Sequence, residues 1–395
     1  MQSILDFIIW SPDPEIFTLP FTDHPVVWYG LLFAGGFILS QQVMFWLFKK
    51  EGRPERDVET LTMFMIIATV IGARLGHCLF YNPKFYLSNP IEILKVWEGG
   101  LASHGGALGI LLGIWLYSNY DIRVGWKFII PVSFKAKKEK REGQSFLWVL
   151  DRLVIVVALT GAMIRTGNFI NSEMEGTETK SRMGVVYARY TKEIMAEVLN
   201  ENERVEKVTF EEGGDKESEI AGRYPITAKV IFKRGEQLDE TDKYLIENSL
   251  RNALLDYSEV TQHVDFGAGQ PLAYKIYEDR GRSVLEIYGI GIVRHAAQLY
   301  EATYCILLMV ALFWFWKNKR NTIPQGFNFA FFMIVLWSLR FVDEFFKMSQ
   351  EAFEDDLLIN MGQILSIPLT LAGILMMILF YKKQKVTMGG EPREI

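Results

Sequence analysis

The sequence is poor in cysteine and histidine and has no excess of basic residues. Its two cysteines, Cys78 and Cys305, both lie inside apolar runs, which excludes a disulfide-stabilised scaffold and a cysteine-based zinc site. The 42 lysines and arginines are outnumbered by 47 aspartates and glutamates, and no basic face stands out, so nucleic-acid binding is disfavoured. The N-terminal residues lack the basic segment of a cleaved signal, so we expect the first helix to be a retained anchor.

Common motifs of enzymatic catalysis are absent as well. The chain has no P-loop, no GxSxG or HExxH motif and no acidic metal cluster. Each of these places a phosphate cradle, a nucleophile or a metal at a fixed spacing. Nucleophilic catalysis by the protein itself is therefore unsupported, and the sequence implies neither a metal nor a cofactor.

What the sequence has instead is long apolar runs. Half of its 395 residues are apolar, and they gather into stretches of about 20 residues, the length needed to cross a bilayer as a helix. We therefore expect a polytopic α-helical membrane protein with about seven transmembrane helices. The fourth is the least regular, because Asp151 and Arg152 lie near its start. The predicted spans are 25–48, 60–81, 99–119, 146–166, 295–316, 327–346 and 363–381.

The charges of the connecting segments predict the orientation of these spans. The segments that follow the first, third, fifth and seventh spans hold 18 lysines and arginines, whereas the short segments 1–24, 82–98 and 347–362 hold three. Basic loops are retained in the cytoplasm. The N-terminus should therefore lie outside the membrane and the C-terminus in the cytoplasm.

One connection is too long and too polar to be a simple loop. Residues 172–293 carry 24 acidic and 16 basic residues, so we expect an extracytoplasmic α+β head between the fourth and fifth helices. Within it, Ile226–Phe232 alternates like a strand, Asp239–Tyr257 has helical spacing, and the residues around 279–281 indicate a hairpin. The charged segment Glu201–Glu219 predicts a mobile loop. The expected division is 1–171 for four helices, 172–293 for the head, 294–381 for three helices and 382–395 for a cytoplasmic tail.

Polar side chains inside the spans gather at one depth. An ionisable group at membrane depth is costly and usually functional. Arginine binds phosphate through paired hydrogen bonds, and histidine can act as a base near neutral pH. The set therefore predicts an outer-leaflet site for an anionic headgroup. With the predicted orientation, the residues in the outer part of the bilayer are Tyr29, Arg74, His77, His104, Arg165, Asn168, His295, Gln298, Glu301, Arg340, Glu344 and Gln363.

Structural explanations compete with this prediction. Arg340 and Glu344 are four residues apart and could form an ion pair that only neutralises both, whereas Arg165 has no carboxylate within the preceding helical turn. His104 could be an interfacial residue without a role. The glycines from Gly99 to Gly113 favour close helix packing, although a bare backbone also lets a headgroup approach.

Several short motifs, in order along the spans, resemble one known family. They are Trp28-Tyr29-Gly30, Gly72–Gly76, Ser103–Gly106, Arg165–Asn171, Arg294–Glu301, Arg340–Phe346 and Met361–Ser366. Together they resemble the prolipoprotein diacylglyceryl transferases of bacteria over nearly the whole membrane portion. The resemblance implies an inner-membrane enzyme with two substrates, phosphatidylglycerol and a prolipoprotein signal peptide with a lipobox cysteine. The diacylglyceryl group would move to the cysteine thiol, forming a thioether and releasing glycerol 1-phosphate.

The resemblance also implies the residues of the site. We expect catalytic roles for His104, Tyr29, Arg165 and Arg340. A thiol is mostly protonated at neutral pH, so His104 is the candidate base, with Tyr29 or direct entry of a thiolate as alternatives. The remaining positions, together with Arg165, would bind substrate: Gly105, Asn168, Glu173, Gly176, Glu301 and Glu344.

The chain departs from the family pattern in places. The family usually has Pro where Ala296 stands and Tyr where Leu336 stands, so no role is carried over to Leu336. The head is also longer than usual for the family.

Functions other than an enzyme are also compatible with a polytopic membrane protein. A polytopic transporter, or a lipid-binding membrane protein with an outer-leaflet anion site, could also hold polar residues in its spans. Transporters often have duplicated halves and bind their substrate at the midplane, and this sequence has no evident repeat. A receptor whose head binds a ligand would leave the intramembrane arginines unexplained.

Overall fold

The computed structural model divides the chain into two compact units. We call Met1–Phe33, Met163–Thr303 and Arg340–Gln363 the head unit, and Ala34–Ala162, Tyr304–Leu339 and Ile364–Ile395 the helical unit. The structure describes residues 7–20, 25–96, 100, 102–127, 130–181, 183–200, 203–213, 220–348 and 359–389.

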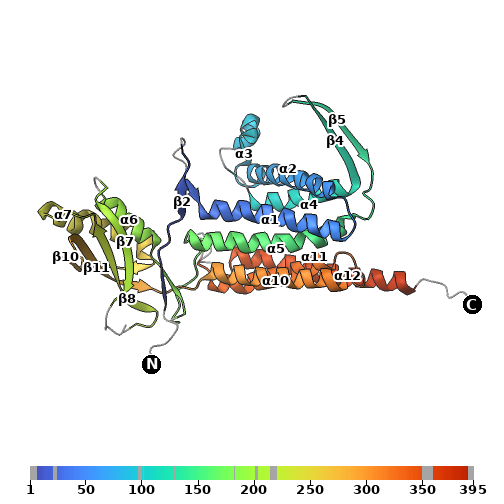
Figure 1. The fold of residues 1–395 in the computed structure, drawn as a ribbon. Helices are drawn as coiled ribbons and strands as arrows, with labels where there is room; N and C mark the ends of the chain where they lie inside the picture. Colours follow the sequence, from blue (N-terminus) through green and yellow to red (C-terminus); the bar gives the residue numbers. More distant parts are fainter. Residues whose placement is uncertain are drawn as a thin grey trace, which may run out of the picture. The chain divides into compact units, whose positions relative to one another are not determined.

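The head unit is built around an antiparallel sheet in the order β10-β11-β8-β7, with the short β9 paired to β11 (Figure 1). β8 contains the segment that alternation predicts as a strand, and its alternate residues Ile226, Ala228 and Val230 are buried. Strands β10 and β11 form the expected hairpin, with Arg280 and Gly281 at positive φ in the turn. The strands are β7 (Val205–Glu212), β8 (Arg223–Phe232), β9 (Val264–Asp265), β10 (Tyr274–Asp279) and β11 (Arg282–Ile292).

Helices pack against the buried side of this sheet. Asp239 begins α7 with a capping box, in which its side chain accepts from the N–H groups of Thr241 and Asp242. Ile246 and Leu250, which the helical spacing singles out, are fully buried in the core of the head. The helical segments are α6 (Arg189–Leu199), α7 (Glu240–Leu245), the π-helical turn η4 (Ile246–Leu250), α8 (Arg251–Asp256) and α9 (Ser258–Thr261).

The prediction of a mobile loop over Glu201–Glu219 is wrong for its central part, because β7 occupies Val205–Glu212. The charges lie on the open side of the strand, where Glu211 pairs with Lys229 at 2.6 Å, while Val208 is buried in the core. Charge density alone hid the strand. Residues 201–202 and 214–219 lie outside the described residues.

Two short strand pairs complete the head unit. β1 (Ile8–Trp10) runs parallel to β6 (Val185–Tyr187), and β2 (Glu15–Thr18) runs antiparallel to β3 (Pro25–Val27). The ring of Trp10 stacks on Phe169, and its Nε1 donates to the Phe169 carbonyl at 2.9 Å. β1 is thereby held against the last turn of the helix α5 (Phe146–Ile170).

Seven helices occur at the positions of the seven predicted spans. Among the described residues, five of them, α1, α2, α5, α10 and α12, are long and apolar enough to cross a membrane. The third and sixth positions hold α4 and α11, each of 17 residues. The bounds are α1 (Trp28–Lys50), α2 (Glu55–Phe80), α4 (Ser103–Asn119), α5 (Phe146–Ile170), α10 (Ala297–Lys319), α11 (Phe327–Asp343) and α12 (Met361–Gly389).

The remaining elements of the helical unit follow α2 and α4 along the chain. They are α3 (Pro83–Ser88), the 3-10 turn η1 (Pro90–Leu94), and the hairpin of β4 (Tyr120–Lys127) with β5 (Ile130–Lys138). In Figure 1 this hairpin follows directly from the end of α4. The core of the unit is formed by buried side chains of α1, α2, α4, α5, α10 and α11, including Leu47, Ile114 and Leu312.

Helices α2 and α4 approach each other through glycine. A Cβ added to Gly76 would lie 2.7 Å from Cα of Gly105, and one added to Gly113 would lie 2.7 Å from Cβ of Ala68. Side chains at these glycines would force the two helices apart. Close packing, the structural explanation for this glycine series, is therefore present in the structure.

Candidate active site

The carboxylate of Glu301 joins three cationic side chains in the head unit. Its Oε2 lies 2.9 Å from Nε of Arg165 and 3.0 Å from Nζ of Lys347. Its Oε1 lies 3.2 Å from Nη1 of Arg340. The side chain of Glu301 is only 7 % exposed, and a buried carboxylate is stable only when its charge is compensated. One side chain at the start of α10 therefore ties together the ends of α5 and α11.

Lys347 is the member of this cluster that sequence reasoning missed. It follows the 3-10 turn η5 (Glu344–Phe346), and its side chain is 4 % exposed. Its Nζ lies 3.2 Å from Oδ2 of Asp343 and 3.6 Å from Oε1 of Glu344. In the sequence, Lys347 is only one of the three basic residues in the short segments between spans. Its spacing of three and four residues from two carboxylates was the signal that could have found it.

Arg165 has an ion-pair partner, so the apparent difference between the two arginines does not hold. The preceding helical turn offers Arg165 no carboxylate, but Glu301 reaches it from α10. Both arginines thus have a structural explanation as well as a functional one. Their side chains are 17 % and 25 % exposed, against 7 % for Glu301, so the two arginines are more accessible than the carboxylate that they share.

Asn168 connects Arg165 to the segment that follows α5. Its Oδ1 accepts from Nη1 of Arg165 at 3.2 Å, and its Nδ2 donates to Oε2 of Glu173 at 3.2 Å. Nη1 of Arg165 also contacts Sδ of Met174 at 2.9 Å. Because Asn168 is buried, it holds the arginine and the acidic residue in a fixed relation.

The backbone at Glu173 is fixed independently of its side chain. Nε2 of Gln298 donates to the Glu173 carbonyl at 2.7 Å, and Oε1 of Gln298 accepts from the hydroxyl of Tyr187 at 3.0 Å. Gln298 and Tyr187 are both buried. Gln298, which the depth pattern singled out, therefore positions the segment beside the arginine cluster.

Gly176 lies where three chain segments meet. Its N–H donates to the carbonyl of His295 at 2.9 Å, and the next N–H, of Thr177, donates to the carbonyl of Phe346 at 2.8 Å. A Cβ at position 176 would lie 2.5 Å from the His295 carbonyl oxygen and 2.6 Å from that of Phe346. Only glycine fits at position 176. The close approach places this segment beside Phe346, the residue that precedes Lys347.

A buried group of ionisable side chains surrounds the same segment. Nη1 of Arg294 donates to the Gly176 carbonyl at 3.2 Å, and Nη2 of Arg294 donates to that of Gln262 at 2.7 Å. Nε2 of His263 lies 3.6 Å from Oε1 of Glu175. Burial lowers the pKa of His263 to about 3 and raises the pKa of the Glu175 carboxyl. These buried groups hold the segment around Gly176 in place.

Glu344 extends the cluster toward the start of α12. Its Oε1 lies 3.4 Å from Nη2 of Arg340, which is the ion pair that the spacing predicts. Its Oε2 accepts from Nδ2 of Asn360 at 3.2 Å. A Cβ at Gly362 would lie 2.5 Å from Oε1 of Glu344, so the glycine of this motif provides room for the carboxylate.

Tyr29 lies at the start of α1, within the head unit. A Cβ at Gly167 would lie 2.9 Å from Cδ2 of the Tyr29 ring, so the glycine beside Arg165 allows the ring to pack closely. On its own helix the ring of Tyr29 stacks on Phe33. The position of the ring is thus set by the motif that also carries Arg165 and Asn168.

The other two predicted site residues, His104 and Gly105, belong to the helical unit. His104 is exposed in the first turn of α4, and Gly105 packs against α2. Arg74 of α2 holds the chain that leads into α4, since it donates to the carbonyls of Ile93 at 3.0 Å and Gly100 at 3.3 Å. Its guanidinium also lies over the ring of Tyr86.

The head unit therefore brings together eight of the ten predicted site residues. They are Tyr29, Arg165, Asn168, Glu173, Gly176, Glu301, Arg340 and Glu344.

The cluster is suited to bind an anion. Three cations, Arg165, Arg340 and Lys347, are matched by the carboxylates of Glu301, Asp343 and Glu344. A guanidinium has five N–H donors, so each arginine can hold its carboxylate and still donate to a phosphate. Among the described residues, no group of three or more His, Cys, Asp or Glu side chains could hold a metal ion.

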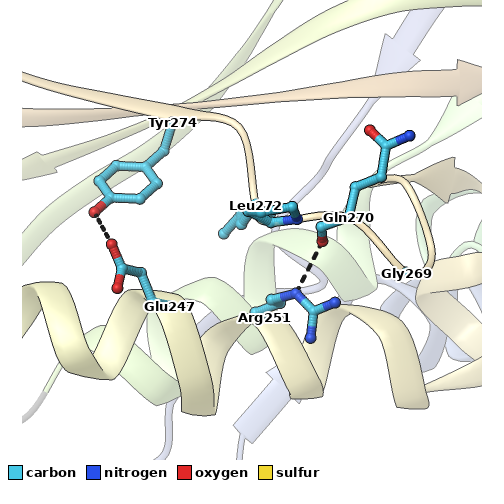
Figure 2. A pocket seen from close by; sticks show the side chains of 7 residues that line it. Glu247, Arg251, Gly269, Gln270, Leu272 and Tyr274 are labelled. Carbon is cyan, nitrogen blue, oxygen red and sulfur yellow. Dashed lines mark hydrogen bonds between the residues drawn. The ribbon is translucent and has the colours of Figure 1, made fainter.

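The head also has a shallow surface pocket that shares no residue with this cluster. Figure 2 shows its polar groups paired with one another: the hydroxyl of Tyr274 donates to Oε1 of Glu247 at 2.8 Å, and Nε of Arg251 donates to the Gln270 carbonyl at 3.1 Å. The cavity measures about 390 Å³, and its lining also includes Leu272. Its principal polar groups are already satisfied, so it is the weaker candidate site.

Comparison with known proteins gives one consistent result. The sequence model of the family described as prolipoprotein diacylglyceryl transferase matches residues 14–379. A phosphatidylglycerol–prolipoprotein diacylglyceryl transferase of Tolumonas auensis is 31 % identical over 95 % of this chain and 99 % of the relative. Proteins of the same name from Porphyromonas gingivalis, 30 % identical over 94 % of each chain, and Bacteroides fragilis, 26 % identical over 98 % of this chain and 100 % of the relative, are also similar. The chain therefore belongs to the prolipoprotein diacylglyceryl transferase family.

Proposed function

We propose that this protein transfers the diacylglyceryl group of phosphatidylglycerol to the lipobox cysteine of a prolipoprotein. The sulfur attacks the glyceryl carbon that bears the phosphate, a carbon–sulfur bond forms, and the carbon–oxygen bond to glycerol 1-phosphate breaks. The thiol proton goes to a base. The observation that carries the proposal is the sharing of Glu301 by Arg165 and Arg340, which holds two guanidinium groups together at one buried carboxylate.

In this proposal the arginines stabilise the departing phosphate. Negative charge grows on the phosphate oxygens as the carbon–oxygen bond breaks, and fixed cations directed at growing charge usually make the largest contribution to catalysis. The pairing with Glu301 keeps both guanidinium groups in place before the lipid arrives, so little reorganisation is needed. Asn168 and Glu173 would bind the glycerol end of the headgroup or align Arg165.

The base is proposed to be His104, whose ring is exposed at the start of α4. Its exposure leaves it available to a substrate thiol, and the Arg74 contacts fix the chain that precedes it. Tyr29 and direct entry of a thiolate are the alternatives. Gly105 would then contribute mainly through its packing against α2, with backbone access to the headgroup as a second role.

The proposal includes a topology in a bacterial inner membrane. Seven helices would cross the bilayer, with α4 and α11 as the two short members, and residues 172–293 would form an extracytoplasmic head. The N-terminus would lie outside and the C-terminal tail, 382–395, in the cytoplasm. Reporter fusions after Lys50, within 135–141 and after Lys385 should report cytoplasm, and one near Glu217 should report the outside. A cytoplasmic signal at Glu217 would contradict the orientation.

A direct assay tests the activity. Purified full-length protein is mixed with phosphatidylglycerol and a lipobox peptide, and the peptide mass is followed by mass spectrometry. We expect the mass of one diacylglyceryl group on the peptide and glycerol 1-phosphate in solution. A peptide with serine in place of the cysteine is the matched control and should stay unmodified. Binding of phosphatidylglycerol without transfer would favour the lipid-binding or transporter alternative.

A further inference from the structure

A second polar cavity lies within the helical unit, apart from the residues proposed for catalysis. Its volume is about 250 Å³, far more than the roughly 30 Å³ that one water molecule occupies in the liquid. It is formed where α1 and α10 end and where α5 and α11 begin. The side chains that matter here are Glu51, Arg53, Asp151, Arg152, Arg320 and Asn328.

The two carboxylates of this cavity are already satisfied by the protein. Glu51 accepts from both Nη2 and Nε of Arg152, at 2.7 and 3.0 Å, and from Nε1 of Trp148 at 3.0 Å. Asp151 accepts from the backbone N–H groups of Gly326 at 2.7 Å and Phe329 at 3.0 Å, at the start of α11. Glu51 is thus paired with Arg152, whereas Asp151 is held, among the described residues, by backbone donors alone.

Two arginines that line the same cavity, Arg53 and Arg320, have no acidic partner within ion-pair distance in the described part of the chain. Nη1 of Arg53 donates to the Glu142 carbonyl at 3.1 Å, but its buried Nε has no hydrogen-bond partner among the described residues. The guanidinium of Arg320 lies over the ring of Trp316, 4.9 Å from its centre. With three arginines and two carboxylates, the lining of the cavity has a formal excess of one positive charge.

An unpaired acceptor lies in the same cavity. Asn328 is 3 % exposed, and its Nδ2 donates to the carbonyls of Asp151 and Leu312. Its Oδ1 has no hydrogen-bond partner among the described residues. Buried polar atoms are nearly always paired, so a partnerless donor on Arg53 and a partnerless acceptor on Asn328 point to a bound polar molecule.

We propose that this cavity binds the phosphate of an anionic phospholipid headgroup. Guanidinium groups are the preferred partners of phosphate, and Asn328 can accept from a hydroxyl of the headgroup. A lipid is favoured over free phosphate because the lining also includes the apolar residues Trp148, Trp316, Ile323 and Pro324. Arg53 lies over the ring of Trp148 and Arg320 over that of Trp316. Basic cavities between transmembrane helices on the cytoplasmic side are typical headgroup sites. The leaflet rests on the orientation proposed above, whereas the binding chemistry does not.

The experiment uses delipidated full-length protein titrated with phosphatidic acid and followed by native mass spectrometry. We expect two lipids per chain, one at the arginine cluster around Glu301 and one here. The double variant Arg53→Gln, Arg320→Gln should retain the first lipid and bind the second at least tenfold more weakly. The double variant Lys317→Gln, Lys319→Gln removes the same charge from the last turn of α10 without lining the cavity, and it should bind both.

Several results would overturn the proposal. These are equal binding by the wild type and the arginine variant, an equal loss in the lysine control, or displacement of the second lipid by millimolar inorganic phosphate. Because Arg320 is exposed, Arg320→Gln alone carries the test should the double variant prove unstable. Diacylglyceryl transfer is measured on the same preparations and should stay within twofold of the wild type in the arginine variant. A failure of the proposed activity would thus be seen separately from a failure of the second site.

Discussion

Nζ of Lys347 lies 3.0 Å from Oε2 of Glu301, and the two side chains are 4 % and 7 % exposed. Replacing Lys347 by Gln removes one of three cations from a buried carboxylate and the ion-pair partner of Asp343. Breaking a buried pair in this way should lower the free energy of unfolding by on the order of 3 kcal/mol. Thermal unfolding of the detergent-solubilised protein measures the loss.

Lys84→Gln is the matched control, because Lys84 is exposed in α3, and it should unfold like the wild type. The double variant Glu301→Gln, Lys347→Gln should lose less stability than the two single losses added together, since it removes both charges of one pair. A Lys347→Gln protein as stable as the wild type would show that the pair contributes nothing.

The two arginines should be sensitive to geometry as well as to charge. Lysine keeps the charge but loses the planar fork that binds phosphate, so Arg165→Lys and Arg340→Lys should each lose most transfer activity while protein levels stay near normal. Arg282→Lys, at an exposed ion pair with Glu206 in the head sheet, is the control and should stay active. Transfer to the lipobox peptide is the measurement.

Glu344 separates two roles of a carboxylate beside Arg340. Glu344→Gln should reduce transfer less than Arg340→Lys if Glu344 only orients the guanidinium, and more if it also handles a proton. Full activity of both lysine variants would contradict the proposal that Arg165 and Arg340 bind the lipid phosphate through paired hydrogen bonds. If either variant is missing from the membrane, that arginine is needed for folding, and its role is structural.

Replacing His104 should reduce activity without affecting folding. Its ring is exposed in the first turn of α4, so His104→Gln should leave the protein folded and inserted. Transfer should fall by roughly 10²–10⁴, the usual loss on removing an acid–base group. The measurement is the rate of peptide modification at saturating lipid. Near-normal turnover would reduce His104 to an interfacial residue and make Tyr29 the next candidate.

The head should become less stable in acid because of His263. Burial holds its pKa at about 3 in the folded protein, against 6.5 when exposed. Between these values the unfolded head binds a proton that the folded head does not, so stability falls as the pH falls from 6.5 toward 3. The effect is at most about 5 kcal/mol. Glu175 opposes it, because its raised pKa lets the folded head bind a proton before the unfolded head does.

Amide hydrogen exchange of β9 and β11 in the full-length protein, corrected for intrinsic rates, measures this opening. The wild type should exchange faster at pH 5 than at pH 7, and His263→Gln should show a smaller difference. The same protection at both values of pH in the wild type would mean that the buried imidazole does not control opening of the head.

The positions of the helices could be predicted because apolar runs can be read from the chain and the bilayer thickness sets the length that a spanning helix needs. Their ends could not. Helix α2 begins at Glu55 rather than near residue 60, because acidic residues stabilise a first turn but interrupt an apolar run. Strand β7 was missed for a related reason, since its charges mask the alternation that buries Val208.

The candidate site could be predicted only in its intramembrane part. Arg165, Glu301 and Arg340 stand out because charges are rare in apolar runs. Lys347 lies past the end of the sixth run and looked like any loop lysine. The pairing of Arg165 with Glu301 depends on helices that are separated by the whole head in sequence, so no local spacing could have revealed it.

The carboxylates of Glu51 and Glu301 differ in the stage of synthesis at which their ion-pair partners become available. Glu51 meets Arg152 after 101 further residues have been made, and α5, which carries Arg152, precedes the head. The indole of Trp316, which also donates to Glu51, is synthesised 265 residues after Glu51. Glu301 and its partners Arg165 and Lys347, by contrast, come from both sides of the head. A ribosome-bound chain that ends within the head can therefore complete the first ion pair but not the arginine cluster, so the part proposed for catalysis is among the last to assemble.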